Sequence, residues 1–223
     1  MAKISWSYSS LKTFQQCPKK YYHIKVAKDF KDQDSTATIY GKEVHKAAEE
    51  YIRDGTPIPE KFKFIEPTLE SLNKIPGDKY CELQMGLTVN LEPTGFLAED
   101  TWWRGIVDLL IVNGDEAYVV DYKTSKNAKY ADMGQLDLLA TAVFAHFPQV
   151  KRIKSALIFV ISNEFLKKHH VSEKIKEYIA PYQFDLSRLE TALERGVWNA
   201  NSGPLCGFCP VKDCPHYREK KRV

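Results

Sequence analysis

The sequence lacks the long apolar runs that membrane insertion and secretion require. No stretch of its 223 residues approaches the roughly 18 uncharged apolar residues of a membrane-spanning helix. The opening segment, Met1 to Tyr8, is polar and has no apolar core of the kind that a signal peptide carries. These absences predict a protein without a membrane partner that stays in a reducing cytoplasm.

The sequence also has little excess charge and no internal repeat or low-complexity linker. Its 32 Lys and Arg against 29 Asp and Glu leave a net charge of +3. A protein that coats DNA would be far more basic, whereas an enzyme that binds nucleic acid in one groove could have this balance. With 43% hydrophobic and 27% charged residues, the chain has an ordinary globular composition. We expect a single domain over residues 1–223.

Cysteine is scarce, and its distribution is uneven. Three of the five cysteines lie within nine residues near the C-terminus, namely Cys206, Cys209 and Cys214. In a cytosolic chain this spacing indicates metal ligation rather than disulfides. Cys17 could supply a fourth thiolate from the other end of the chain. Alternatively His216, two residues after Cys214, could complete a Cys₃His zinc site without Cys17.

Hydrophobic periodicity predicts a mixed α/β chain. Apolar residues at helical spacing favour helices over 39–54, ended by Gly55 and Pro57, and over 131–147. Alternation predicts a half-buried strand over 81–90, with Cys81 as an ordinary thiol on its apolar face. Strands over about 102–113 and 116–123 and a buried strand over 153–161 complete an α-β-β-β-α-β order over a core of about 38–165.

The ends of the chain give a weaker pattern. A short helical run occupies 5–30. Beyond the core we expect a strand near 175–184 and a helix near 186–199, while the run Lys167 to His170 is typical of a solvated face. The N-terminal 5–30 and C-terminal 185–217 segments are predicted to be joined by the cysteine ligands as a clasp.

The strands 102–113 and 116–123 should form a hairpin around Asn113-Gly114-Asp115. With a two-residue Gly114-Asp115 loop, Asp108 stands directly opposite Asp121. With an Asn113-Gly114 loop the two are diagonal neighbours. In both registers the carboxylates share a face, where directly opposed Cβ atoms lie about 4.5–5.5 Å apart.

Lys123 projects from the same face because it lies two residues after Asp121. Two carboxylates in apolar strands need a partner, and a hard divalent cation such as Mg²⁺ or Mn²⁺ would be one. The alternative is an exposed hairpin in which Lys123 offsets two aspartates.

These residues resemble those of the PD-(D/E)xK nucleases. The resemblance is carried by Gly105-x-x-Asp108 followed by Asp121-Tyr122-Lys123, and by the α-β-β-β-α-β order of their restriction-endonuclease-like core. Gly41-Lys42-Glu43-Val44-His45 is similar to the helix motif of the RecB-like exonuclease branch, and Gln135 to its Gln-x-x-x-Tyr motif, although Leu139 stands at the Tyr position. Cys17-Pro18 within an aromatic N-terminal motif, with the late cysteines, resembles the iron–sulfur subset.

The resemblance implies a role for each residue. His45, Asp108, Asp121 and the backbone carbonyl of Tyr122 would hold Mg²⁺ or Mn²⁺, and Lys123 would position the attacking water. Glu82 would be the extra acidic residue of the family. The set implied for a [4Fe-4S] cluster is Cys17, Cys206, Cys209 and Cys214.

The function implied is metal-dependent hydrolysis of DNA, beginning at single-stranded ends, in replication, recombination or repair. A phage or bacterial source would agree with the resemblance. Two other functions stay open at this point. One is a scaffold or nucleic-acid-binding subunit that keeps the fold without catalysis. The other is a zinc-binding regulatory protein.

Overall fold

The computed structural model describes residues 5–31, 35–129 and 131–218, which fall into two compact units. One unit combines Met1–Asp34 with Pro181–Val223, and the other is Ser35–Ala180. The second unit contains every residue predicted to hold the divalent metal or to act beside it. The first contains the four predicted cluster cysteines. Within the described residues, no helix is long and apolar enough to cross a membrane.

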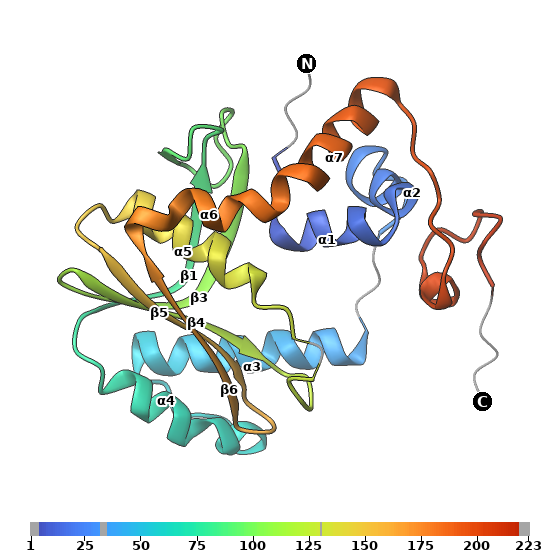
Figure 1. Ribbon diagram of the computed structural model, residues 1–223. Helices are drawn as coiled ribbons and strands as arrows, with labels where there is room; N and C mark the ends of the chain where they lie inside the picture. Colours follow the sequence, from blue (N-terminus) through green and yellow to red (C-terminus); the bar gives the residue numbers. More distant parts are fainter. Residues whose placement is uncertain (1–4, 32–34, 130, 219–223) are drawn as a thin grey trace. The chain divides into compact units, whose positions relative to one another are not determined.

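A six-stranded sheet forms the centre of the Ser35–Ala180 unit (Figure 1). Its strand order is β2-β1-β3-β4-β5-β6, and only the β4–β5 pair is parallel. The strands are β1 Asp78–Leu87, β2 Pro93–Thr94, β3 Trp103–Asn113, β4 Glu116–Lys123, β5 Arg152–Phe159 and β6 Glu164–Val171. The expected restriction-endonuclease-like α/β fold is confirmed, because α3, three antiparallel strands, a crossover helix and a parallel strand follow in the predicted order.

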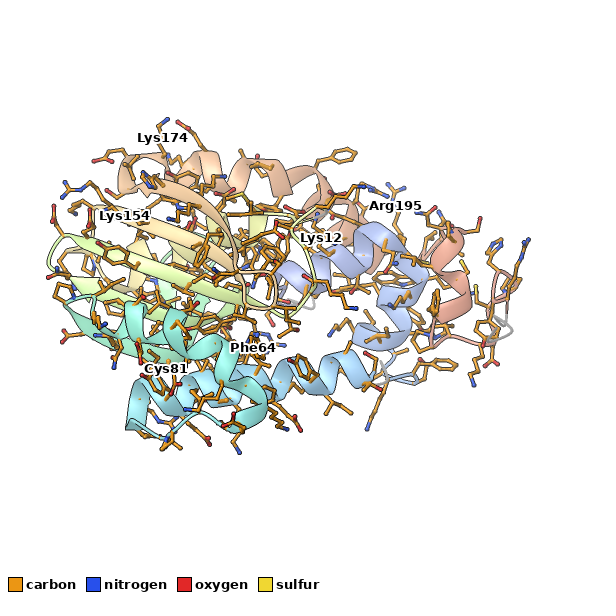
Figure 2. The ribbon with its side chains drawn as sticks, turned by 90° about the horizontal axis from the view of Figure 1, so that it is seen from below. Lys12, Phe64, Cys81, Lys154, Lys174 and Arg195 are labelled. Atoms are coloured by element: carbon orange, nitrogen blue, oxygen red, sulfur yellow. The ribbon has the colours of Figure 1, made fainter. Side chains whose placement is uncertain are left out.

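Helices cover the two faces of this sheet. Figure 1 shows α3 (Thr36–Asp54) and α4 (Glu66–Asn73) on one face and α5 (Gly134–His146) on the other. A 3-10 turn, η2 (Glu60–Ile65), precedes α4. Buried apolar side chains of α3, η2 and α4 pack against those of β3, β4 and β5. Figure 2 shows Cys81 close to α3 and α4, and this thiol packs against the same core.

The helix predicted over 39–54 is confirmed as α3, with an earlier start. Ser35 is its N-cap and accepts a hydrogen bond from the Thr38 amide, so the helix begins at Thr36. Its end is as predicted, because Gly55 has a φ of 71°, the left-handed conformation that glycine adopts without a steric cost. The cap fixes the start of the helix that carries His45.

The hairpin register is the first of the two predicted. Asn113 pairs with Glu116, so the loop is Gly114-Asp115, and Gly114 has a φ of 62°. The strands on either side end within one residue of the predicted bounds. Strand β1 covers 78–87 rather than 81–90.

The predicted strand near 175–184 is wrong. This segment is the helix α6 (Ile175–Ile179), between the 3-10 turns η3 (Ser172–Lys174) and η4 (Ala180–Tyr182). The last strand is instead β6, which includes the run predicted as a solvated face. Alternation along β6 turns Lys168 and His170 toward α5, where each contacts the Asp137 carboxylate at 2.8 Å. The polar residues of β6 did not indicate a strand, because their partner, Asp137, lies far from them in the sequence.

The other unit is helical. It contains α1 (Tyr8–Gln16), α2 (Pro18–Tyr21), the π-helix η1 (Tyr22–Val26), α7 (Gln183–Arg195) and the 3-10 turn η5 (Pro204–Phe208). The predicted helix near 186–199 corresponds to α7, which ends earlier, at the left-handed Gly196. The Tyr21 ring stacks on Trp198 with ring centroids 6.0 Å apart, so an aromatic contact links the two sequence-distant parts of this unit.

Candidate active site

Three neighbouring strands bring the acidic residues together. Cys81 pairs with Leu109 and Leu83 with Val107, so Glu82 lies between these pairs, across from Asp108. Glu82 has a φ of 49°, a left-handed conformation that a non-glycine residue rarely adopts and that is common near functional sites. The strand pairing thus places one carboxylate of β1 beside one of β3.

The β3–β4 pairing places Asp121 next to Asp108. The regular ladder runs as far as the pair of Leu109 and Val120, and one further step in the same register puts Asp108 opposite Asp121. At that point the Tyr122 amide donates to Oδ2 of Asp108 at 2.7 Å instead of to a backbone carbonyl. The predicted shared face of the two aspartates is therefore present in the structure.

His45 reaches this group of carboxylates from α3. Its Nε2 lies 3.0 Å from the carbonyl oxygen of Tyr122, and its Nδ1 lies 3.4 Å from Oδ2 of Asp108 and 4.0 Å from Oε1 of Glu82. Burial disfavours the imidazolium, but the Asp108 carboxylate outweighs it and raises the pKa of His45. The helix thus places an imidazole beside Glu82 of β1, Asp108 of β3 and the Tyr122 carbonyl of β4.

Burial and mutual repulsion raise the pKa values of two carboxyl groups. Asp121 is 3% exposed, and burial together with the Asp108 charge raises its pKa to about 6. Glu82 is half-buried, and the same two causes raise its pKa to about 7. Crowded carboxylates of this kind are stabilised when a cation lies between them.

Lys123 and Gln135 partner the buried Asp121. The Gln135 amide donates to Oδ1 of Asp121 at 2.8 Å, and its carbonyl oxygen accepts from the Lys123 ammonium at 3.1 Å. Lys123 Nζ also lies 2.5 Å from Oδ2 of Asp121. Gln135 therefore holds the lysine and the carboxylate together, with the amide oriented by both.

The donor set fits a hard divalent cation. Among the described residues, His45, Glu82 and Asp108 are the group that offers three ligand atoms within 4.8 Å of one another. Oδ2 of Asp121 is buried and, apart from its ion pair with Lys123, makes no hydrogen bond within the described chain. Carboxylate oxygens with one imidazole and a nearby backbone carbonyl suit Mg²⁺ or Mn²⁺.

A groove of about 660 Å³ opens beside these residues. Four predicted site residues line it, namely His45, Glu82, Tyr122 and Lys123. Thr124 also lines it, and the sequence motifs did not single out this residue. The one signal for Thr124 is its position directly after the Asp121-Tyr122-Lys123 motif.

Leu139, at the position where the related helix motif has Tyr, is buried on α5. A side chain on Gly105 would approach Cδ2 of Leu139 to 3.2 Å, so the two residues are packed closely. Leu139 belongs to the core and offers no surface for a nucleic-acid contact. The presence of Leu rather than Tyr at this position of the motif is therefore explained by packing in the core.

The four predicted cluster cysteines line one cavity of about 380 Å³ in the helical unit, together with His216. The thiol of Cys17 accepts hydrogen bonds from the amides of Lys20 and Asn201, at 3.5 and 3.4 Å. Cys206 accepts one from Gly203 at 3.3 Å. Within the described residues, no three of these thiols and imidazoles come within 4.8 Å of one another.

One protein-family model matches most of the chain. The family model described as the PD-(D/E)XK nuclease superfamily matches residues 5–74 and 81–214. These ranges include the candidate active-site residues and the four predicted cluster cysteines, but not His216. No curated protein matches the chain.

Solved structures share the fold. The crystal structure of a proposed exonuclease from Eubacterium rectale has a TM-score of 0.52 at 15% identity, over 99% of this chain and 91% of that one. The structure of the protein SSO0001 has a TM-score of 0.47 at 13% identity, over 98% and 89%. At 15% identity, the similarity to the Eubacterium rectale structure is evidence for a shared fold.

Proposed function

This chain belongs to the PD-(D/E)XK nuclease superfamily, and we propose that it is a metal-dependent DNA nuclease that hydrolyses single strands from a free end. The observation that carries the proposal is the convergence of His45, Glu82 and Asp108 beside the Asp121, Lys123 and Gln135 group. A scaffold without catalysis would not need a buried carboxylate paired with a lysine. The likeness to a proposed exonuclease supports action at ends.

We propose that His45, Asp108, Asp121 and the Tyr122 carbonyl hold Mg²⁺ or Mn²⁺, with Glu82 beside them. A bound divalent ion lowers the pKa of water and polarises a phosphate oxygen. The chain's own contribution is to orient the ligands: the Tyr122 amide fixes Asp108, and Gln135 fixes Asp121.

Lys123 has the geometry of a residue that positions the attacking water. Its side chain is a third exposed, and its ammonium is held between Asp121 and Gln135. A remaining N–H of the ammonium can therefore donate a hydrogen bond to a water or to a phosphate oxygen. A positive charge at that position stabilises the charge that develops on the phosphate. The side chain needs no large movement to do so.

The test is digestion of end-labelled DNA by the purified chain. We expect cleavage of linear single strands with Mg²⁺ or Mn²⁺ and none with a chelator. Lys123→Ala should lose about 10³-fold in rate, whereas Lys154→Ala, which removes an exposed lysine of β5 (Figure 2), should not. Absence of metal-dependent cleavage on every DNA substrate would overturn the proposal. Efficient cutting of circular single strands would overturn the requirement for an end.

We further propose that Cys17, Cys206, Cys209 and Cys214 bind a [4Fe-4S] cluster. Thiolates around a single zinc lie within about 4 Å of one another, given Zn–S bonds of about 2.3 Å, and no three of the described thiols lie within 4.8 Å of one another. Backbone amides that donate to Cys17 and Cys206 would stabilise thiolate ligands. A cluster would join segments from the two ends of the sequence within one unit.

Anaerobic purification followed by iron, sulfide and zinc analysis tests the cluster. We expect brown protein whose iron is lost in Cys17→Ser and retained in Cys81→Ser, the matched control in the other unit. Stoichiometric zinc that is retained in Cys17→Ser and lost in His216→Ala would establish the Cys₃His site instead.

A further inference from the structure

The groove beside the candidate active site differs in charge along its length. The residues that α3 contributes recur at helical spacing and form one stripe, namely Ala37, Thr38, Gly41, Lys42, His45, Lys46 and Glu49. The acidic residues that line the groove are Glu49 and Glu82. From His45 toward the start of α3, the charged side chain that this helix contributes to the groove is Lys42, whereas Lys46 and Glu49 lie on the other side of His45. The groove therefore continues from the proposed metal ligands into a basic section.

Thr124 lies in this basic section with an available hydroxyl. It follows Lys123 at the end of β4, and the Val160 amide holds that end by donating to the Lys123 carbonyl at 3.0 Å. The Thr124 side chain is half-buried, and its hydroxyl makes no hydrogen bond within the part of the chain that the structure describes. A polar group fixed in this way, next to the lysine of the site, can bind a ligand without rearrangement.

Gly41 leaves this hydroxyl uncovered on the side of α3. A Cβ at position 41 would lie 3.2 Å from Oγ1 of Thr124, a distance tighter than most Cβ contacts. Lys42, the next residue on the helix, lines the same groove. The missing side chain thus makes room beside a hydroxyl donor and an ammonium.

Resting on the proposed function, we propose that Thr124 and Lys42 bind the phosphate adjacent to the one that is cut. A hydroxyl and a lysine ammonium both donate to phosphate oxygens, and such contacts position a strand without reading its bases. The lining residues include no Asn, Gln or Arg that could read a base edge. The substrate contact is therefore sequence-independent and sits one step along the backbone from the metal ligands.

The experiment combines protein variants with neutralised phosphates in the substrate. Single methylphosphonates are placed in turn at each position around the cut of a linear oligonucleotide. In the natural chain, the methylphosphonate next to the cut should lower kcat/KM about 10-fold or more, as expected for loss of a hydrogen bond to a charged group. Thr124→Val should lower kcat/KM similarly on unmodified DNA, with Thr124→Ser close to the natural chain. Thr56→Val, which changes an exposed threonine beyond the other end of α3, is the matched control.

Coupling between the two changes distinguishes phosphate binding from a structural effect. In Thr124→Val, the methylphosphonate next to the cut should have a smaller effect than in the natural chain, because only the contact with Lys42 is left to lose, while methylphosphonates elsewhere keep their effects. A Thr124→Val protein that cleaves normally, or that loses activity with an unchanged methylphosphonate profile, would overturn the inference. Oligonucleotide binding in Ca²⁺ provides the same comparison without cleavage. If the natural chain fails to cut DNA but its binding still depends on Thr124 and this phosphate, the proposed function fails and the phosphate site stands.

Discussion

The side-chain amide of Gln135 bridges Asp121 and Lys123, donating to the carboxylate at 2.8 Å and accepting from the ammonium at 3.1 Å. These three side chains come from β4 and α5, and α5 follows β4 in the chain and covers one face of the sheet. The bridge fixes the lysine next to a buried carboxylate, where two charged groups would otherwise have several relative orientations.

Gln135→Ala should lower kcat about 10- to 100-fold and change KM little, because the two groups it orients act on the reaction rather than on strand binding. Steady-state kinetics on linear single-stranded DNA provides the measurement. Gln183→Ala, at an exposed glutamine that begins α7, is the control. An equal loss in Gln183→Ala, or an effect confined to KM, would contradict the orienting role of Gln135.

The metal-free protein should become more stable when Asp121 is replaced by Asn. The raised pKa of Asp121, about 6 against 3.8 in the unfolded chain, means that burying its charge costs stability. That cost is absent below pH 3.8 and is complete above about pH 6. Asp121→Asn should therefore gain on the order of 1 kcal/mol or more above this range, and nothing below it.

Denaturant unfolding with a chelator present, at a pH on each side of this window, measures the effect. The same substitution should abolish cleavage, with a loss of about 10³-fold or more. A variant that was both less stable at high pH and fully active would contradict the placement of Asp121 at the metal.

Cleavage should depend on pH through competition between protons and metal. The pKa values of Glu82 and Asp121, about 7 and about 6, are both raised, so each carboxyl is neutral and a poor ligand below its pKa. At limiting Mg²⁺, kcat/KM should rise between about pH 6 and 7, and saturating Mg²⁺ should move this rise to lower pH.

Glu82→Gln tests which group produces the upper part of the rise, since the amide does not titrate. It should remove that part while leaving the lower part, due to Asp121. A pH profile that is identical at low and high Mg²⁺ would contradict a metal site built on these carboxyls.

Tyr122 should contribute through its backbone alone. Its carbonyl oxygen contacts His45, and its amide contacts Asp108. Its phenol hydroxyl is buried and makes no hydrogen bond within the described chain. Burial also raises the pKa of the phenol strongly, so it stays neutral. Tyr122→Phe should keep full activity and leave the free energy of unfolding unchanged or higher by about 1 kcal/mol.

Cleavage rates together with denaturant unfolding check this prediction. Tyr118→Phe is a useful comparison, because the Tyr118 hydroxyl does donate to Glu116, at 3.1 Å. A large loss of activity in Tyr122→Phe would indicate a role for the phenol that the contacts do not support.

Much of the site could be predicted from local sequence, because strand periodicity is strict. In a two-residue hairpin, the positions of Asp108, Asp121 and Lys123 on one face follow from counting, and the structure has the predicted Gly114-Asp115 loop. The α3 helix, which carries His45, could likewise be predicted from its apolar stripe and from Gly55.

Contacts between distant segments could not be predicted in this way. The edge strand β6 was missed because the partner of its polar residues, Asp137, lies on α5, far away in the sequence. The approach of Gly41 to Thr124 and the bridge made by Gln135 depend on how helices pack against the sheet. The left-handed Glu82 lies between two residues of β1 that are paired with β3. Local sequence determined which residues share a strand face or a helix stripe, since backbone geometry sets those periods. Only tertiary packing decided which of these faces meet, because side-chain distances between elements depend on the whole core.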